Sequence, residues 1–267
     1  MDLPIWQIIL LAVVQGIAEF LPISSSGHLV VLATLLKVDP EQFDLVELNI
    51  VLHAGTLGSI LVVYRRQLVE ALTKDWRILF LLCVATVPAV IAAVLLKITD
   101  GDQLLESPLV AGICLLITGS ILLLSQRLTL SEQPYDKISW WQAWWLGCAQ
   151  AFAILPGISR SGSTICSGQA LGLSREAAAT FSFLMAVPAI LGAITLELGK
   201  KIADSGENEA GMPVWLLLLG AFVSFAVGWA SLVLLLKMIQ RGRLHWFAWW
   251  CFAVGLFVIL WQATIGD

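Results

Sequence analysis

Residues 15–28 read QGIAEFLPISSSGH and residues 150–164 read QAFAILPGISRSGST, and these two stretches decide the fold. Each interrupts a long apolar region with a cluster of proline, glycine and serine. Shifted by 135 residues, they are identical at six positions, pairing Gln15 with Gln150, Ala18 with Ala153, Ile23 with Ile158, Ser24 with Ser159, Ser26 with Ser161 and Gly27 with Gly162. The breaking prolines, Pro22 and Pro156, lie one register apart. Paired breaks in two halves of a chain indicate an inverted-repeat membrane fold with a central site.

The composition places the chain in a membrane. Of its 267 residues, 59% are hydrophobic and 13% are charged, with a mean hydropathy of +0.89. Soluble domains average about 45 to 50% apolar and about 25% charged residues. These values exclude a soluble enzyme, a disordered chain and a basic nucleic-acid-binding domain. The five cysteines lie singly within hydrophobic stretches, so neither a disulfide framework nor a zinc site is indicated.

Six segments reach the roughly 20 apolar residues that a membrane-crossing helix needs. They are residues 45–64, 76–98, 108–126, 177–198, 213–239 and 245–262. The interrupted regions, residues 4–36 and 140–173, each divide into two helices that are too short, or barely long enough, to cross alone. We therefore predict an all-α polytopic integral membrane protein, one membrane domain over residues 1–267, with six full transmembrane helices and two re-entrant hairpins. Three spans separate the hairpins, so they enter from opposite faces, in inverted-repeat halves of about residues 1–126 and 140–262.

Basic residues favour one orientation of this layout. With the amino terminus outside, ten lysines and arginines fall in cytoplasmic segments and four in outer segments. Short cytoplasmic loops carry the excess of basic residues in membrane proteins, so we expect both termini outside. The remaining basic residue, Arg160, lies inside the second interrupted region.

The first break carries the groups for a nucleophile and a cation. Gln15 and Glu19 are four residues apart, so on a helix they share a face. Their side-chain oxygens suit a hard cation such as Mg2+ or Ca2+. Ser25 and His28 are three residues apart, close enough for the imidazole to take a proton from the hydroxyl and activate a serine nucleophile.

The second break adds a binding group for an anion. A helix that restarts after each proline directs free backbone N–H groups and neighbouring hydroxyls at the cavity, which favours a phosphate. The guanidinium of Arg160 has a fork geometry that matches phosphate oxygens. The two breaks together can bind a phosphate and cleave its bond.

Each feature also has a structural interpretation. Gln15 could form a hydrogen bond between helices, the serines could cap helices, and Glu19 with Arg160 could form a structural ion pair. His28 could be a satisfied interior histidine. His53, on the first full span, could line the cavity or form a hydrogen bond between helices. The coincidence of these residues at two matched breaks favours a functional site.

The chain resembles the bacterial undecaprenyl-diphosphate phosphatases, also called bacitracin-resistance proteins. The resemblance is carried by residues 15–28, by residues 156–164 and by FSFLMAVP at residues 181–188, and it covers essentially the whole chain. It implies hydrolysis of undecaprenyl diphosphate to undecaprenyl phosphate and inorganic phosphate, which recycles the carrier lipid for cell-wall synthesis and confers bacitracin resistance. It also implies a divalent cation and an active site on the outer side of the bacterial cytoplasmic membrane.

Carried onto this sequence, the resemblance implies Ser25 as the nucleophile, with His28 and Glu19 as its acid–base and metal-side partners. The residues expected to bind the diphosphate are Arg160, Ser159, Thr164, Ser24 and Ser26. Many members of the family have a glutamate where this chain has Gln15. A glutamine can bind a metal through its amide oxygen but cannot act as a base, so Glu19 carries the carboxylate role alone.

A polyprenyl-phosphate flippase or transporter is the main alternative, because inverted repeats with broken helices are also a transporter architecture. A carrier needs a binding site but no nucleophile. A structural membrane component would leave a buried arginine and glutamate without a purpose. The expected partners are the membrane and a long-chain polyprenyl diphosphate, with no nucleic acid, and the sequence leaves a homodimer open.

Overall fold

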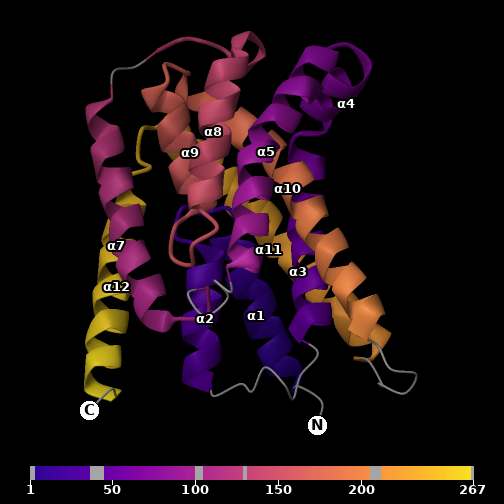
Figure 1. The fold of residues 1–267 in the computed structure, drawn as a ribbon, viewed down its shortest axis with the longest axis vertical. Coiled ribbons are helices and arrows are strands. Elements are labelled where there is room, and N and C mark those ends of the chain that lie inside the picture. Colours follow the sequence, from indigo (N-terminus) through magenta and orange to yellow (C-terminus); the bar gives the residue numbers. More distant parts are fainter. Residues whose placement is uncertain (1–3, 37–44, 100–104, 129–130, 205–211, 266–267) are drawn as a thin grey trace.

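The computed structural model describes residues 4–36, 45–99, 105–128, 131–204 and 212–265, and in this part of the chain all long elements are helices (Figure 1). They are α1 (Ile5–Ala18), α2 (Ser25–Leu36), α3 (Leu45–Val63), α4 (Arg65–Thr73), α5 (Trp76–Ile98), α7 (Pro108–Leu124), α8 (Trp140–Phe152), α9 (Arg160–Ala170), α10 (Arg175–Asp204), α11 (Val214–Gln240) and α12 (Trp246–Ile265). Two short 3-10 turns, η1 (Ser125–Arg127) and η2 (Tyr135–Lys137), lie between α7 and α8. The prediction of an all-α chain is confirmed.

Within the described residues, five helices are long and apolar enough to cross a membrane, namely α5, α7, α10, α11 and α12. They fall on the predicted spans 76–98, 108–126, 177–198, 213–239 and 245–262. The predicted span 45–64 corresponds to α3, which passes the same test only together with α4. These two helices are bent by 77° to each other. The chain is therefore a multi-pass helical membrane protein, and its described residues contain five candidate spans, or six if the bent pair counts as one.

Polar residues mark several helix starts. Asp75 accepts backbone hydrogen bonds at the start of α5, and Ser107 does so before the proline that begins α7. Ser139 and Gln142 form a reciprocal capping box at the start of α8. Such caps satisfy N–H groups that the first turn of a helix leaves free.

Small and polar residues contribute to the contacts between helices beside a buried apolar core, and many other large apolar side chains face outward. On α3 and α11, Ser59 and Ser224 each donate a 2.8 Å hydrogen bond to a carbonyl of the opposite helix. Outward-facing Trp76 and Val214 are 72% and 70% exposed. This distribution is typical of helices packed within a lipid bilayer.

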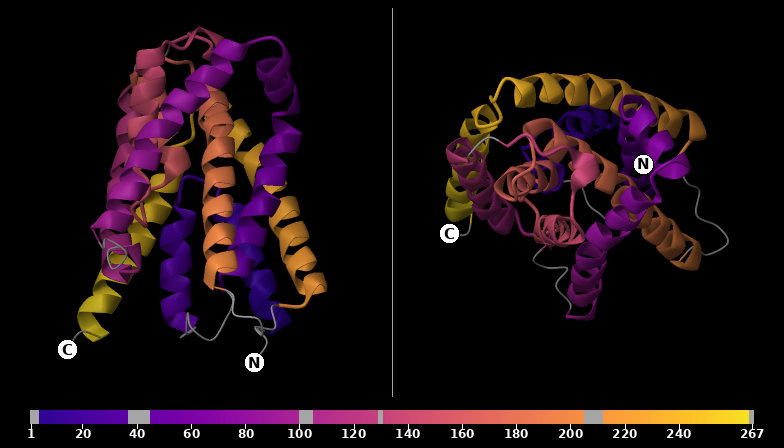
Figure 2. Two further views of the ribbon diagram at one scale, coloured as in Figure 1. Left: turned by 45° about the vertical axis from the view of Figure 1, so that its right-hand side comes forward. Right: turned by 90° about the horizontal axis from the view of Figure 1, so that it is seen from above.

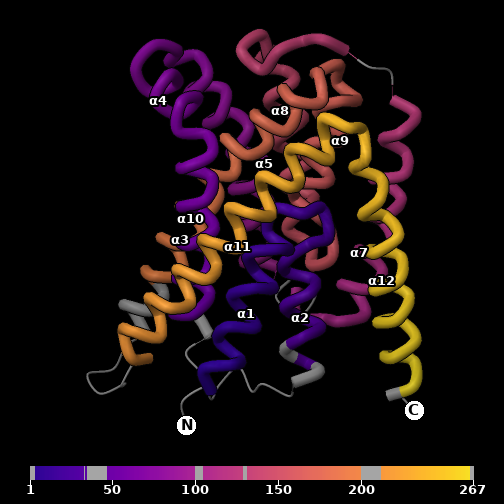
Figure 3. The backbone as a smooth tube through the Cα atoms, turned by 180° about the vertical axis from the view of Figure 1, so that it is seen from behind, coloured from indigo at the N-terminus to yellow at the C-terminus, as the bar shows by residue number. Residues whose placement is uncertain are grey.

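The two interrupted regions lie in opposite halves of the molecule. Along the long axis, α1 and α2 share one half with both termini, whereas α8 and α9 occupy the other half (Figures 1 and 2). α11 packs against α1 and α3, α12 against α7, and α5 against α8. Seen from behind, α11 crosses the molecule obliquely next to α1 (Figure 3). The turns after α1 and α8 are thus enclosed by longer helices.

Gly55→Ala is expected to lower the free energy of unfolding by about 1–3 kcal/mol, because the new Cβ would clash with the Ala221 carbonyl oxygen on α11. Gly192→Ala on α10 is the matched control, since nothing lies within 4 Å of the position its Cβ would take. Thermal unfolding of both variants in one detergent measures the difference. Equal melting temperatures would contradict close packing of α3 on α11.

Candidate active site

The turn between α1 and α2 contains a residue in the left-handed conformation. Ser24 has φ 69°, and it is the one non-glycine residue with a positive φ in the described part of the chain. This conformation is costly for a residue with a side chain. The Ser24 hydroxyl accepts a hydrogen bond from the N–H of Gly27 at 3.3 Å, and its carbonyl accepts one from His28 Nδ1 at 2.8 Å. These bonds hold the turn that restarts the chain as α2 at Ser25.

The turn between α8 and α9 also contains a residue with a positive φ, and here it is a glycine. Gly157 has φ +90°, and a Cβ there would clash with the Ala111 carbonyl oxygen, so the position requires glycine. Ser159 caps α9 by accepting a 3.1 Å hydrogen bond from the N–H of Gly162. Thr118 of α7 anchors the turn, because its hydroxyl donates to the Gly157 carbonyl at 2.7 Å and accepts from the Ser159 N–H at 3.0 Å.

The two turns are in direct contact. The Ser24 hydroxyl also accepts a 3.1 Å hydrogen bond from the N–H of Gly157, 133 positions away in the sequence. A Cβ on Gly27 would lie 2.8 Å from the backbone of Gly157, so the close approach depends on a glycine here too. The structure therefore brings both sequence breaks to one place.

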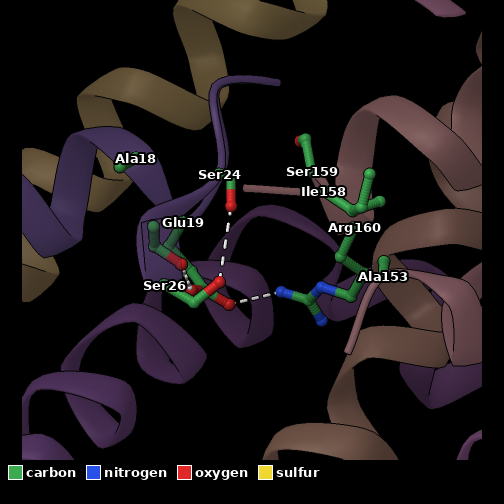
Figure 4. A pocket seen from close by; sticks show the side chains of 9 residues that line it. Ala18, Glu19, Ser24, Ser26, Ala153, Ile158, Ser159 and Arg160 are labelled. Atoms are coloured by element: carbon green, nitrogen blue, oxygen red, sulfur yellow. Dashed lines mark hydrogen bonds and ion pairs between the residues drawn. The ribbon is translucent and has the colours of Figure 1, made fainter. Parts of the chain in front are cut away.

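Glu19 is the centre of the polar groups at this contact, and it is only 8% exposed. Its Oε1 forms an ion pair with Nη2 of Arg160 (Figure 4). Its Oε2 accepts hydrogen bonds from Gln15 Nε2 at 3.1 Å and from Ser25 Oγ at 3.0 Å. Nε2 of His53, on α3, lies 3.9 Å from the same oxygen. Groups from α1, α2, α3 and α9 thus converge on one carboxylate.

His28 has other partners than the sequence predicts. Its Nε2 accepts a 2.9 Å hydrogen bond from the indole N–H of Trp250, while its Nδ1 faces the Ser24 carbonyl. Because an indole N–H can only donate, Nε2 carries no proton and Nδ1 carries it. Sequence spacing predicts a hydrogen bond from Ser25 to His28, whereas Ser25 donates to Glu19. The difference arises because the imidazole folds back onto the carbonyl four residues earlier.

Two adjoining cavities meet at Ser25 and Ser26. The smaller, of about 170 Å3, is lined by Ala18, Glu19, Ser24, Ser25, Ser26, Ala153, Ile158, Ser159 and Arg160 (Figure 4). The larger, of about 470 Å3, is lined by five apolar residues of α1, α2 and α3, such as Leu11, Leu29 and Leu52, and by six polar residues, namely Ser25, Ser26, Asn49, His53, Glu106 and Glu197. A polar chamber that opens beside a partly apolar one suits a molecule with a charged head and a hydrocarbon chain.

Thr164 does not line either cavity. Its side chain is fully buried, and its hydroxyl contacts that of Ser182 at 2.6 Å and donates to the Arg160 carbonyl at 2.7 Å. It therefore fastens α9 to α10 one turn beyond Arg160. Of the residues predicted to bind the diphosphate, Ser24, Ser26 and Ser159 do line the smaller cavity.

Three side chains that contact the site lie outside the two breaks. The structure supports the interpretation in which His53 lines a cavity. The sequence indicates this residue because an ionisable side chain within an apolar span often faces a cavity. The roles of Thr118 and Trp250 cannot be predicted from the sequence, because single threonines and tryptophans are common in apolar helices. Their partners are 39 and 222 positions away.

The oxygen donors fit a cation that is bound together with a phosphate. Gln15 Oε1 is buried without a hydrogen-bond partner, next to the Glu19 carboxylate. Among the described residues there is no group of three or more His, Cys, Asp or Glu that could hold a metal ion. Mg2+ commonly binds through one or two carboxylates together with substrate phosphates and water. The described residues offer an incomplete donor set of that kind and no group of ligands that would hold the ion alone.

Known proteins match nearly the whole chain. The family model described as bacitracin resistance protein BacA matches residues 8–257, which include both breaks. An undecaprenyl-diphosphatase of Rhodopirellula baltica is 49% identical, over 95% of this chain and 96% of its own. The undecaprenyl-diphosphatase of Desulfatibacillum aliphaticivorans is 39% identical, over 95% of this chain and 97% of its own. That of Carboxydothermus hydrogenoformans is 37% identical, over 97% of this chain and 98% of its own.

Ser24→Ala is expected to lower the free energy of unfolding by about 1–3 kcal/mol, because the N–H groups of Gly27 and Gly157 lose their buried acceptor. Ser120→Ala on α7 is the control, since its side chain is exposed and donates to a carbonyl of its own helix. Unfolding of both variants in detergent measures the two losses. An equal decrease in the free energy of unfolding of both variants would show that the hydrogen bond between the turns does not stabilise the protein.

Proposed function

The chain belongs to the bacitracin resistance protein BacA family, and we propose that the contact between its two turns is where it hydrolyses undecaprenyl diphosphate to undecaprenyl phosphate and inorganic phosphate. One observation carries this assignment. A serine hydroxyl, a carboxylate and a guanidinium, from Ser25, Glu19 and Arg160, are linked in one small cavity. The reaction returns carrier lipid to cell-wall synthesis, and the family takes its name from the resulting bacitracin resistance.

In the proposed architecture, α1 with α2 and α8 with α9 are re-entrant hairpins that join six spans in an inverted repeat of about residues 1–126 and 140–262. α1 has 14 residues and α8 has 13, so each is about 20 Å long, short of the roughly 30 Å hydrocarbon core. Equivalent hydrogen bonds support the repeat: Ser24 accepts from the N–H of Gly27, and Ser159 accepts from that of Gly162.

The proposed location is the bacterial cytoplasmic membrane, with both termini and the active site facing the outer side. α4, which carries Arg65 and Arg66, lies at the end of the molecule opposite both termini (Figure 1). The excess of basic residues belongs on the cytoplasmic side. The larger cavity extends to Asn49 near the start of α3 and to Glu197 near the end of α10, which is the end that holds the termini.

Substrate binding exchanges one partner of Arg160 for another. A phosphate presents oxygens to the guanidinium much as the Glu19 carboxylate does, and it can take over the pairing. The hydroxyls of Ser24, Ser26 and Ser159 line the same cavity and donate to the remaining oxygens. The larger cavity beyond Ser25 receives the first part of the isoprenoid chain.

The nucleophile in this proposal is Ser25. Its Oγ attacks the terminal phosphorus in line with the bridging oxygen, and its proton passes to Glu19 Oε2, 3.0 Å away. The bond between the terminal phosphorus and the bridging oxygen breaks, and Glu19 gives the proton to the departing undecaprenyl phosphate. In the second step Glu19 takes a proton from the attacking water and returns it to Ser25 as inorganic phosphate leaves. His28 supports both steps by holding the Ser24 turn.

The cation of this proposal is Mg2+ or Ca2+, held by Glu19 and by the unpartnered Oε1 of Gln15. When bound, such an ion neutralises charge on the phosphate oxygens during the reaction. Arg160 supplies a fixed positive charge in the same cavity, and it stabilises the negative charge that develops in the transition state.

Ser25→Ala, Arg160→Ala and His28→Ala are each expected to reduce phosphate release from undecaprenyl diphosphate by about 100-fold or more. These variants remove the nucleophile, the phosphate-binding charge and the support of the turn, respectively. The assay uses detergent-purified protein, with circular dichroism and melting temperature as folding checks. Ser120→Ala, an exposed serine on α7, is the control and should keep full activity.

The same assay separates the phosphatase from a flippase. A detergent micelle has no two compartments, so a carrier without a nucleophile would release no phosphate there. Full activity in any one of the three variants would remove that residue from its proposed role.

Removal of divalent cations with a chelator is expected to abolish phosphate release, and added Mg2+ or Ca2+ should restore it. Gln15→Leu should raise the cation concentration for half-maximal activity by about tenfold, because it removes one oxygen donor. Gln150→Leu is the matched control at the equivalent position of α8, where both polar atoms of the side chain are buried without a partner. Unchanged activity in the chelator would rule out a cation role for this site.

A further inference from the structure

Trp250 connects the carboxyl-terminal helix to the active-site turn. Its indole N–H donates to Nε2 of His28 at 2.9 Å, and the two rings lie nearly parallel, at 9°, with centroids 6.2 Å apart. The tryptophan is on α12 and 52% exposed on the outer surface of the helices. The imidazole is the hydrogen-bond partner of this N–H group, and surrounding hydrocarbon would offer it no other acceptor.

The hydrogen bond determines where His28 carries its proton. With Nε2 accepting from the indole, the neutral ring has its proton on Nδ1, which donates to the Ser24 carbonyl at 2.8 Å. The opposite tautomer would place two N–H groups face to face at Trp250 and a bare nitrogen at the carbonyl. Trp250 therefore stabilises the single tautomer that holds Ser24 in its left-handed conformation.

We propose that Trp250 is a positioning residue for the hydrolysis: through His28 it holds the Ser24 turn in the shape that presents the Ser25 hydroxyl to Glu19. Its effect on catalysis rests on the function proposed above, whereas its effect on the imidazole proton does not. The chain of contacts runs from the indole to the imidazole, to the Ser24 carbonyl and on to the next residue, which is the nucleophile.

Trp250→Phe tests this role, because it keeps an aromatic side chain at this position of α12 but has no N–H donor for His28. Trp249→Phe is the matched control, since its ring packs against Phe252 on the same helix. The chain contains three histidines, so nitrogen-15 labelling of histidine gives a short set of ring signals, which a His28→Gln sample assigns.

In the wild type and in Trp249→Phe, His28 should be a single Nδ1–H tautomer. In Trp250→Phe it should be a mixture, and kcat for phosphate release should fall about three- to tenfold with little change in KM, as expected for the loss of one hydrogen bond. An unchanged tautomer in Trp250→Phe would overturn the proposal, and so would a changed tautomer with unchanged kcat. Wild-type protein with the Nδ1–H tautomer but without phosphate release would instead overturn the proposed function.

Discussion

One serine hydroxyl joins the two halves of the site. Ser24 Oγ accepts the N–H of Gly27 within its own turn and the N–H of Gly157 from the other turn. A buried N–H group without an acceptor costs about 1–3 kcal/mol, so separating the turns, which would leave two such groups unpaired, is unfavourable. That penalty outweighs the roughly 1–3 kcal/mol cost of a left-handed serine. The positions of Ser25 at the start of α2 and of Arg160 at the start of α9 follow from this contact.

The buried ion pair is better explained by binding than by stability. Removing two charges from water costs about as much as their attraction returns, and well-packed apolar residues often stabilise a protein equally or more. Glu19 nevertheless has Arg160 on one oxygen and Gln15 and Ser25 on the other. In the absence of substrate, the Glu19 carboxylate therefore fixes the position of the Arg160 guanidinium and prevents it from pairing with another acceptor. In the proposed mechanism, a phosphate replaces the carboxylate as the partner of a guanidinium that is already positioned, and such preorganisation favours electrostatic stabilisation of a transition state.

The sequence predicts those features that depend on local patterns. The predicted span 76–98 has the bounds of α5, because the length of an apolar run and the caps at its ends are local properties. The convergence of Glu19 and Arg160 was also predictable, since the repeat relates their two turns. The hydrogen bond of Ser25 was not, because the ring orientation of His28 depends on Trp250, 222 positions away. Likewise, hydropathy predicts where the apolar run of α3 ends but not the 77° angle at which α4 continues.

In the proposed mechanism, the exchange of partners at Arg160 would make a cation necessary only when substrate is present. Before binding, the guanidinium and the Glu19 carboxylate neutralise each other, and the site requires no further charge. Once a diphosphate takes the guanidinium, Glu19 is left beside an anion in a medium where repulsion is screened poorly. A divalent cation held by Glu19 and Gln15 would offset that repulsion, and Gln15 would supply a neutral oxygen donor without adding charge. In the proposed mechanism, cation binding is therefore coupled to substrate binding, which is consistent with the incomplete donor set that the described residues provide on their own.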